Sequence, residues 1–161
     1  MKRSIDILQK VEVFFCSVAL GIFLIAVIAQ MLTRYLGISA LWTEDVSMYS
    51  FIISVFLGAA AMVRDDKHFA FTALEDKITN PTKRAALNIV ILLVMLGFCV
   101  FMFYYGTLLT KKFWNYKWVS IPAFKRGPTW LCVPVSAFTM VVYILEKLYI
   151  NIKIIRKGGE A

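Results

Sequence analysis

Four long apolar runs, each bounded by charged residues, organise this chain. They cover roughly residues 13–33, 46–63, 85–110 and 130–150. A helix needs about 20 predominantly apolar residues to cross a hydrocarbon core of about 30 Å, and all four runs approach or exceed that length. The pattern predicts an all-α integral membrane protein. Its four transmembrane helices make up a single membrane domain over residues 1–161, with no soluble module.

Composition agrees with this pattern. Hydrophobic residues make up 60% of the 161 residues and the mean hydropathy is +0.74, both outside the range of a soluble domain. The net charge of +8 would suggest a nucleic-acid partner in a soluble protein, but no basic globular segment exists here to bind one. In a membrane protein, Lys and Arg are mainly topology signals and headgroup contacts. We therefore expect contacts with membrane lipids and no contact with nucleic acid.

The positions of the positive charges predict the orientation. Twelve of the 18 Lys and Arg residues lie before the first run, between the second and third runs, or at and after the end of the fourth. The remaining six lie in the first and third loops. The positive-inside rule therefore predicts that both termini are cytoplasmic. The third loop is an exception to the rule, because five of those six residues lie in it.

The chemical groups that most membrane enzymes and carriers need are missing from the middle of the apolar runs. Carriers and proton relays place ionisable side chains at mid-membrane depth, whereas Glu12 lies only at the edge of the first run. A thiol oxidase would need loop cysteine pairs, but Cys16, Cys99 and Cys132 all lie inside the runs. A bis-histidine haem protein would need two histidines, and the chain has only His68, in a loop. We expect a non-enzymatic protein without cofactor or metal that acts through a partner.

Small residues follow one face of the second run at helical spacing. Such residues let helices approach closely in lipid, where the hydrophobic effect does not drive helix association. Two interpretations remain open: packing within this chain, or a docking face for another subunit. The residues are Ser47, Ser50, Ser54, Gly58 and Ala61.

A short amphipathic segment lies between the second and third runs. Phe71, Leu74 and Ile78 share one helical face, opposite the charged residues 75–77. This arrangement is typical of a helix that lies on the membrane surface. The sequence therefore predicts a short amphipathic helix on the cytoplasmic side, which ends before Pro81.

Charged residues flank the first loop. Arg34 precedes it, and Glu44 and Asp45 follow it, so that all three lie at the same depth. The carboxylates complement the positive dipole end of the second helix, and a bidentate Arg–carboxylate bond would join the first two helices. Trp42 suits the headgroup layer. We expect a structural clamp here, with contact to another subunit as the alternative.

The third loop is both basic and aromatic, on the side where positive charge is disfavoured. One interpretation is an aromatic belt whose lysines lie among anionic headgroups. The other is a positive landing surface for an acidic soluble protein, where charge would speed and orient docking. The basic residues are Lys111, Lys112, Lys117, Lys125 and Arg126.

Several short motifs follow one another from the end of the first run to just past the second. In this order and at this spacing they resemble those of the small membrane subunit of the tripartite ATP-independent periplasmic (TRAP) transporters, the DctQ-type family. That family often has an Asp four residues after the histidine, where this chain has Thr72. A role that depends on a His–Asp pair is therefore not expected here. His68 is expected to form surface or interface hydrogen bonds. The motifs are Arg34-Tyr35, Trp42-Thr43-Glu44-Asp45, Gly58-Ala59-Ala60, Arg64 and His68.

The resemblance implies a role in a bacterial inner membrane. The complex would be a secondary importer of an organic anion, such as a carboxylate or sialic acid, driven by a sodium gradient. A large multi-span subunit would hold the substrate and sodium sites. This chain would scaffold that subunit and help to dock a periplasmic solute-binding protein. The alternative is a standalone four-helix assembly or regulatory factor of another membrane complex.

Overall fold

The computed structural model describes residues 2–64 and 81–158, which are largely helical. Four of the helices are long and apolar enough to cross a membrane. The predicted all-α fold with four membrane-spanning helices is therefore confirmed. The elements are α1 (Lys2–Tyr35), α2 (Trp42–Arg64), α4 (Pro81–Phe113), α5 (Arg126–Trp130) and α6 (Cys132–Gly158).

The long helices extend past the apolar runs that predicted them. α1 has 34 residues and α4 has 33, which corresponds to about 50 Å of helix in each case. The hydrocarbon core is only about 30 Å thick. An apolar run marks the segment that suits hydrocarbon, whereas the Lys, Arg, Glu and Gln residues beside it are good helix formers that continue the helix. α1 and α4 therefore either tilt or reach beyond the hydrocarbon layer.

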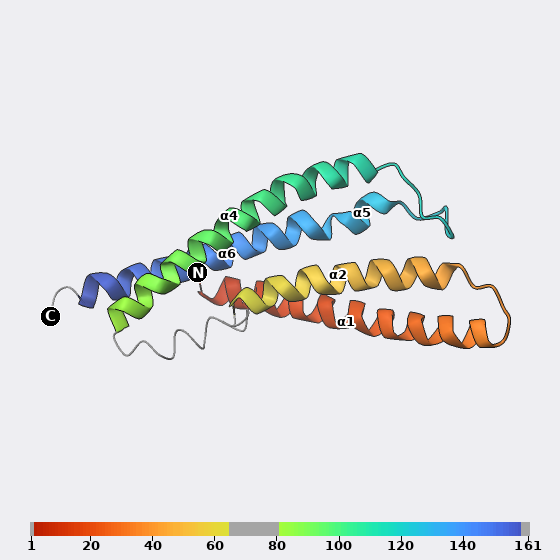
Figure 1. Ribbon diagram of the computed structural model, residues 1–161, viewed down its shortest axis with the longest axis horizontal. Coiled ribbons are helices and arrows are strands. Elements are labelled where there is room, and N and C mark those ends of the chain that lie inside the picture. The colour runs from red at the N-terminus through yellow and green to blue at the C-terminus, as the bar shows by residue number, and fades with distance from the viewer. Residues whose placement is uncertain (1, 65–80, 159–161) are drawn as a thin grey trace.

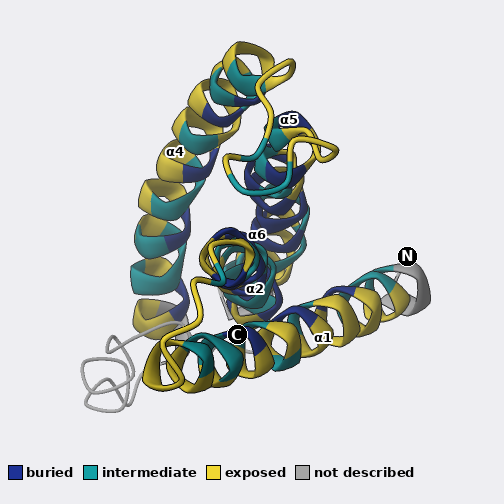
Figure 2. Cartoon of the chain, turned by 90° about the vertical axis from the view of Figure 1, so that its right-hand side faces the viewer, coloured by how far each residue is buried: buried dark blue, intermediate teal, exposed yellow. Residues whose placement is uncertain are grey.

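The helices form two antiparallel hairpins, α1 with α2 and α4 with α6 (Figure 1). α2 and α6 pack against each other in the middle, so that α1 and α4 lie on the outside (Figure 2). α6 supplies half of the main core cluster, which makes it the central helix. That cluster consists of Ala60, Val63, Leu92, Cys99, Met140, Tyr143, Ile144 and Leu148.

A glycine ends α1 and reverses the chain. The Ile38 amide donates to the Thr33 carbonyl at 2.8 Å, and the Gly37 amide donates to the Arg34 carbonyl at 3.2 Å. These two bonds form a Schellman motif, which requires a left-handed residue at its centre. Gly37 has φ of 69°, a conformation that glycine adopts without a Cβ penalty. The turn returns the chain within a few residues, so α2 packs antiparallel along α1.

The fourth span begins with a break. The short helix α5 precedes α6, and Leu131 separates them in a right-handed helical conformation. Pro134 lies in the first turn of α6, where the missing N–H does not interrupt the helix. The Thr110 hydroxyl binds the Trp130 carbonyl at 3.1 Å. α5 is thereby attached to the end of α4.

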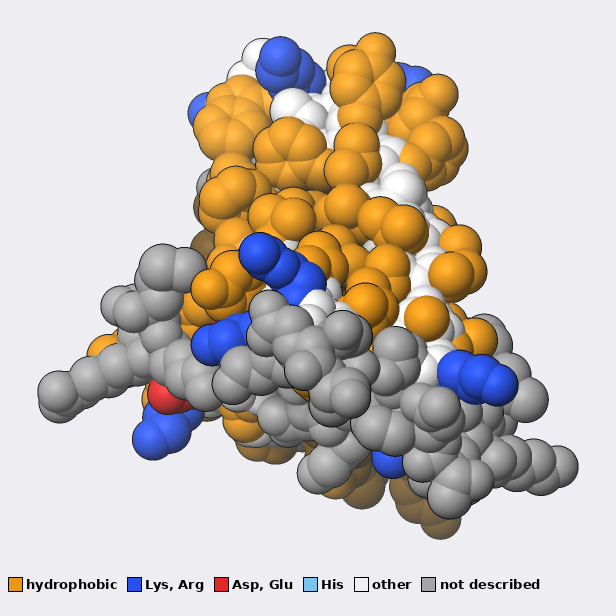
Figure 3. Space-filling model, turned by 90° about the vertical axis from the view of Figure 1, so that its left-hand side faces the viewer, with side chains coloured by type: hydrophobic (Ala, Val, Ile, Leu, Met, Phe, Trp, Pro, Cys, Tyr) orange, Lys and Arg blue, Asp and Glu red, His pale blue; other side chains and the backbone are white. Residues whose placement is uncertain are grey.

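Both chain termini lie at the same end of the helices (Figure 1). We call it the termini end, and the opposite end, with residues 36–41 and 114–125, the loop end. Figure 3 views the termini end: hydrophobic side chains cover the helix sides, and Lys and Arg gather near the viewer and at the far upper end. The predicted amphipathic helix at residues 71–78 lies outside the described residues. Which end faces the cytoplasm stays a prediction.

Candidate functional site

Residues 114–125 form a compact turn at the loop end. The Trp118 amide donates to the Phe124 carbonyl at 2.9 Å, and the Arg126 amide donates to the Tyr116 carbonyl at 2.7 Å. A Cβ at Gly127 would lie 2.6 Å from the Trp114 Cα, so only glycine permits this close approach. Backbone hydrogen bonds and this close approach therefore hold the two ends of the loop together.

Contacts with α2 hold this loop in place. The Ser120 amide donates to the Asp45 carboxylate at 2.8 Å, and the Ser120 hydroxyl donates to the Leu41 carbonyl at 2.9 Å. The Tyr49 and Trp118 rings stack with centroids 4.6 Å apart. Asp45 and Tyr49 are both buried. The first and third loops are thus joined, although 75 residues separate Asp45 from Ser120.

The basic side chains of this region point outward. The four lysines predicted for docking are all exposed, and Arg126 is half-buried. Lys117 and Lys125 face each other across an antiparallel bridge. Like charges that lie directly opposite each other repel, so this pair favours an anionic neighbour. The loop therefore presents positive charge on a fixed backbone at Lys111, Lys112, Lys117 and Lys125.

Arg34 and the acidic pair do not form the expected ion pair within the part of the chain that the structure describes. Arg34 and Glu44 line the same hollow of about 210 Å³ beside the first loop, but within residues 2–64 and 81–158 Arg34 has no ion pair. Asp45 points to Ser120 instead. Glu44 and Trp42 are exposed at the start of α2. Equal depth brings the residues near one another but does not set the direction of their side chains. The role of these residues as a clamp or a subunit contact stays a prediction.

The small-residue face of α2 is used inside this chain. Ser47, Ser50, Ser54 and Ala61 are all buried. The Cys16 thiol of α1 donates to the Ser54 carbonyl at 3.2 Å and lies 2.9 Å from where a Cβ on Gly58 would stand. Of the two interpretations left open by the sequence, the structure supports packing within the chain.

A polar cluster joins three helices at the termini end. The Arg64 guanidinium forms an ion pair with Asp6, donates to the Gln9 side chain at 2.9 Å, and lies 3.5 Å from the Glu146 carboxylate. Gln9 in turn donates to the Ala61 carbonyl at 3.2 Å. Arg64 therefore connects α2 to both α1 and α6. We call Asp6, Gln9, Glu12, Arg64, Tyr143 and Glu146 the termini-end cluster.

Glu12 is the buried member of this cluster. Its side chain is 5% exposed, and Tyr143, which is fully buried, donates a hydrogen bond of 2.7 Å to its Oε2. Oε1 has no hydrogen-bond partner among the described residues. The sequence placed Glu12 at the membrane edge and assigned it no role. The structure instead places it between helices, where the hydrogen bond from Tyr143 offsets part of the cost of burying the carboxylate.

The sequence did carry a signal for this cluster. Asp6, Gln9 and Glu12 recur every three residues, and Tyr143 and Glu146 are three apart, so each set shares one helical face. Arg64 was noted only as part of a motif. His68, the remaining predicted site residue, lies outside the described residues.

One comparison decides the family. The sequence model of the DctQ component of tripartite ATP-independent periplasmic transporters matches residues 23–153. The chain belongs to the DctQ family. It is therefore the small membrane component of a TRAP transporter and a multi-pass membrane protein. No curated protein matches the chain.

The match with the DctQ family includes the loop end and much of the bundle. It begins within α1 and ends within α6, so that it covers the Asp45–Ser120 contact, Arg64 and Tyr143. Asp6, Gln9 and Glu12 lie before it. DctQ membership implies association with a large membrane subunit and a solute-binding protein, and it favours the TRAP role over a standalone assembly factor.

Proposed function

We propose that this DctQ chain scaffolds the large membrane subunit and helps to dock the periplasmic solute-binding protein. The termini would be cytoplasmic and the loop end periplasmic, in a bacterial inner membrane. The observation that carries the docking role is the anchored, basic loop end. Backbone bonds, the Asp45–Ser120 contact and the Tyr49–Trp118 stack hold residues 114–125 in place.

A fixed positive surface suits an acidic protein partner. Charges on a rigid backbone lose less entropy when they dock than charges on a mobile loop. Charge complementarity mainly accelerates encounter and sets orientation, and salt screens it. The repulsion between Lys117 and Lys125 would be relieved by a carboxylate placed between them.

The scaffold role is supported by the exposed outer helices. α1 and α4 bury little of their apolar surface within the chain, which leaves broad faces for a partner or lipid. The central pair α2 and α6 holds the small-residue packing and the termini-end cluster.

The complex would import an organic anion, a carboxylate or sialic acid, driven by sodium. Arg34, Trp42, Glu44 and His68 remain proposed as contacts to the large subunit.

Charge reversal tests the docking role. A variant with Lys111, Lys117 and Lys125 all changed to Glu is expected to slow association of the binding protein at least tenfold at low salt. The measurement is the association rate of the binding protein with the membrane pair in nanodiscs, at low and high salt. The difference from wild type should shrink at high salt, because screening removes the electrostatic contribution.

The matched control reverses lysines at the other end. Lys10, Lys83 and Lys153 are exposed at the termini end, so changing all three to Glu alters the net charge by the same amount without altering the loop end. This control should leave the association rate unchanged. Equal rates for the two variants would exclude docking on the third loop, and its lysines would then be headgroup anchors.

A further inference from the structure

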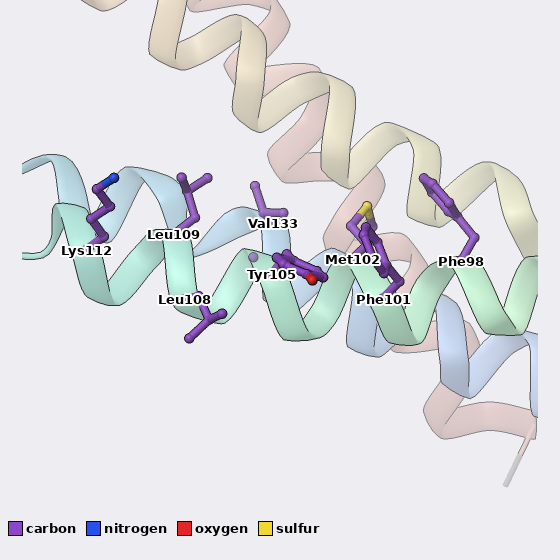
Figure 4. Close-up of a pocket in the computed structure, with 9 residues that line it drawn as sticks. Phe98, Phe101, Met102, Tyr105, Leu108, Leu109, Lys112 and Val133 are labelled. Carbon is purple, nitrogen blue, oxygen red and sulfur yellow. The ribbon is translucent and has the colours of Figure 1, made fainter.

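An apolar groove runs along α4 at the loop end. Its volume is about 470 Å³, and it extends from Phe98 to Lys112 with one wall completed by Val133 of α6 (Figure 4). Met102, Tyr105 and Leu109 line it between those ends. Lys112 is the single charged lining residue among those the structure describes. The groove is thus an apolar surface with one ammonium group at its outer end.

The groove covers one half of the membrane. The span in α4 is Lys83–Phe113, and Phe98 is its middle residue. From Phe98 to Lys112 a helix rises about 21 Å, while half of the hydrocarbon core is about 15 Å and the headgroup layer adds several more. The groove therefore begins near the midplane and ends at the headgroups of the loop-end leaflet.

This depth fits a lipid better than a protein helix. A spanning helix of a partner would cross the midplane and need a groove along the whole of α4. An acyl chain is narrow and ends at the midplane, because the chains of the two leaflets meet there.

The charge at the outer end selects the headgroup. Lys112 lies at the outer end of the groove, at the depth of the lipid phosphates, and Lys111 does not line it. The residues that line the groove include no acid. Lysine near the membrane surface favours anionic lipid by about 1 kcal/mol per residue. Its long apolar stem follows the groove while the ammonium stays at the interface.

We propose that this groove is a binding site for an anionic phospholipid of the loop-end leaflet, with an acyl chain along Phe98–Leu109 and the phosphate on Lys112. The lipid would cover apolar surface that the chain leaves open between α4 and α6. The proposal requires only that the chain spans a membrane, so it can hold or fail independently of the docking role.

Lipid retention tests the charge. The chain of 161 residues is placed in nanodiscs of phosphatidylglycerol and phosphatidylcholine, and the lipids that stay bound are counted by native mass spectrometry. Lys112→Ala is expected to lower the affinity for phosphatidylglycerol fivefold to about tenfold. Lys111→Ala, one residue away and outside the groove, should change it much less. Equal losses for both variants would overturn the site, because retention would then follow net charge alone.

A second pair of variants tests the groove itself. Leu109→Trp fills the part of the groove next to the headgroup and should displace the retained phosphatidylglycerol. Val100→Trp is the control: Val100 is exposed on the same helix but does not line the groove. Unchanged retention in Leu109→Trp would contradict the proposal. So would a cross-link from position 109 to the large subunit in a complex without bound phosphatidylglycerol, since a protein would then occupy the groove.

Discussion

Replacing Arg64 with glutamine is expected to lower the free energy of unfolding by about 3 kcal/mol. Removing one partner of a buried ion pair leaves the other charge uncompensated, which costs several kcal/mol. Here the Arg64 and Glu146 side chains are only 15% and 18% exposed, whereas Asp6 is 52% exposed. Most of the loss should therefore come from Glu146 and Gln9, because solvent already screens the pair with Asp6. The measurement is reversible unfolding in mild detergent.

Arg156→Gln is the matched control for this change. Arg156 lies at the same end on α6 and is exposed, so the variant removes an identical charge from the surface. It should change stability by less than about 0.5 kcal/mol. Similar losses in both variants would mean that net charge, rather than the termini-end cluster, sets the stability.

Replacing Asp45 with alanine is expected to release the third loop from α2. The hydrogen bond from the Ser120 amide to a buried carboxylate is worth about 1.5–3 kcal/mol. Its loss should speed hydrogen exchange of the Ser120 amide roughly tenfold to a hundredfold. Exchange measured by mass spectrometry on peptides that cover residues 114–125 would report this change. Binding-protein association should slow in the same variant, because the lysines would no longer be presented on a fixed backbone.

Glu44→Ala provides the control. Both carboxylates lie in the first turn of α2 and complement its dipole, but Glu44 is exposed, and the Ser120 amide donates to Asp45. Exchange at Ser120 should stay at the wild-type rate in this variant. Faster exchange in both variants would show that the helix dipole, and not the Asp45–Ser120 bond, holds the loop.

The four spans could be predicted because length and hydropathy alone select them. The ends of the helices could not be predicted in this way, because a helix that leaves the hydrocarbon continues until a residue that ends helices follows. For α1 that stop is the left-handed Gly37. The apolar run ends at residue 33, while the helix itself ends at Tyr35.

The absence of the expected Arg34 ion pair among the described residues and the failure to predict the termini-end cluster have a common cause. Both concern which way a polar side chain points, and that depends on helices far away in the sequence. Asp45 binds Ser120, and Glu12 accepts from Tyr143 across 131 residues. Sequence spacing shows that Asp6, Gln9 and Glu12 share a face, but not that α2 and α6 meet that face. The basic loop was recognised from composition, whereas its anchoring depends on such long-range contacts.

The native mass of this chain, purified in mild detergent from cells that also express its large TRAP membrane subunit, tests the scaffold role most directly. We expect a stable one-to-one complex that survives purification at moderate salt, because a scaffold must stay bound while the large subunit works. A monomer or homo-oligomer that leaves the large subunit behind would contradict the account, and the function of this DctQ chain as a scaffold would then have to be abandoned.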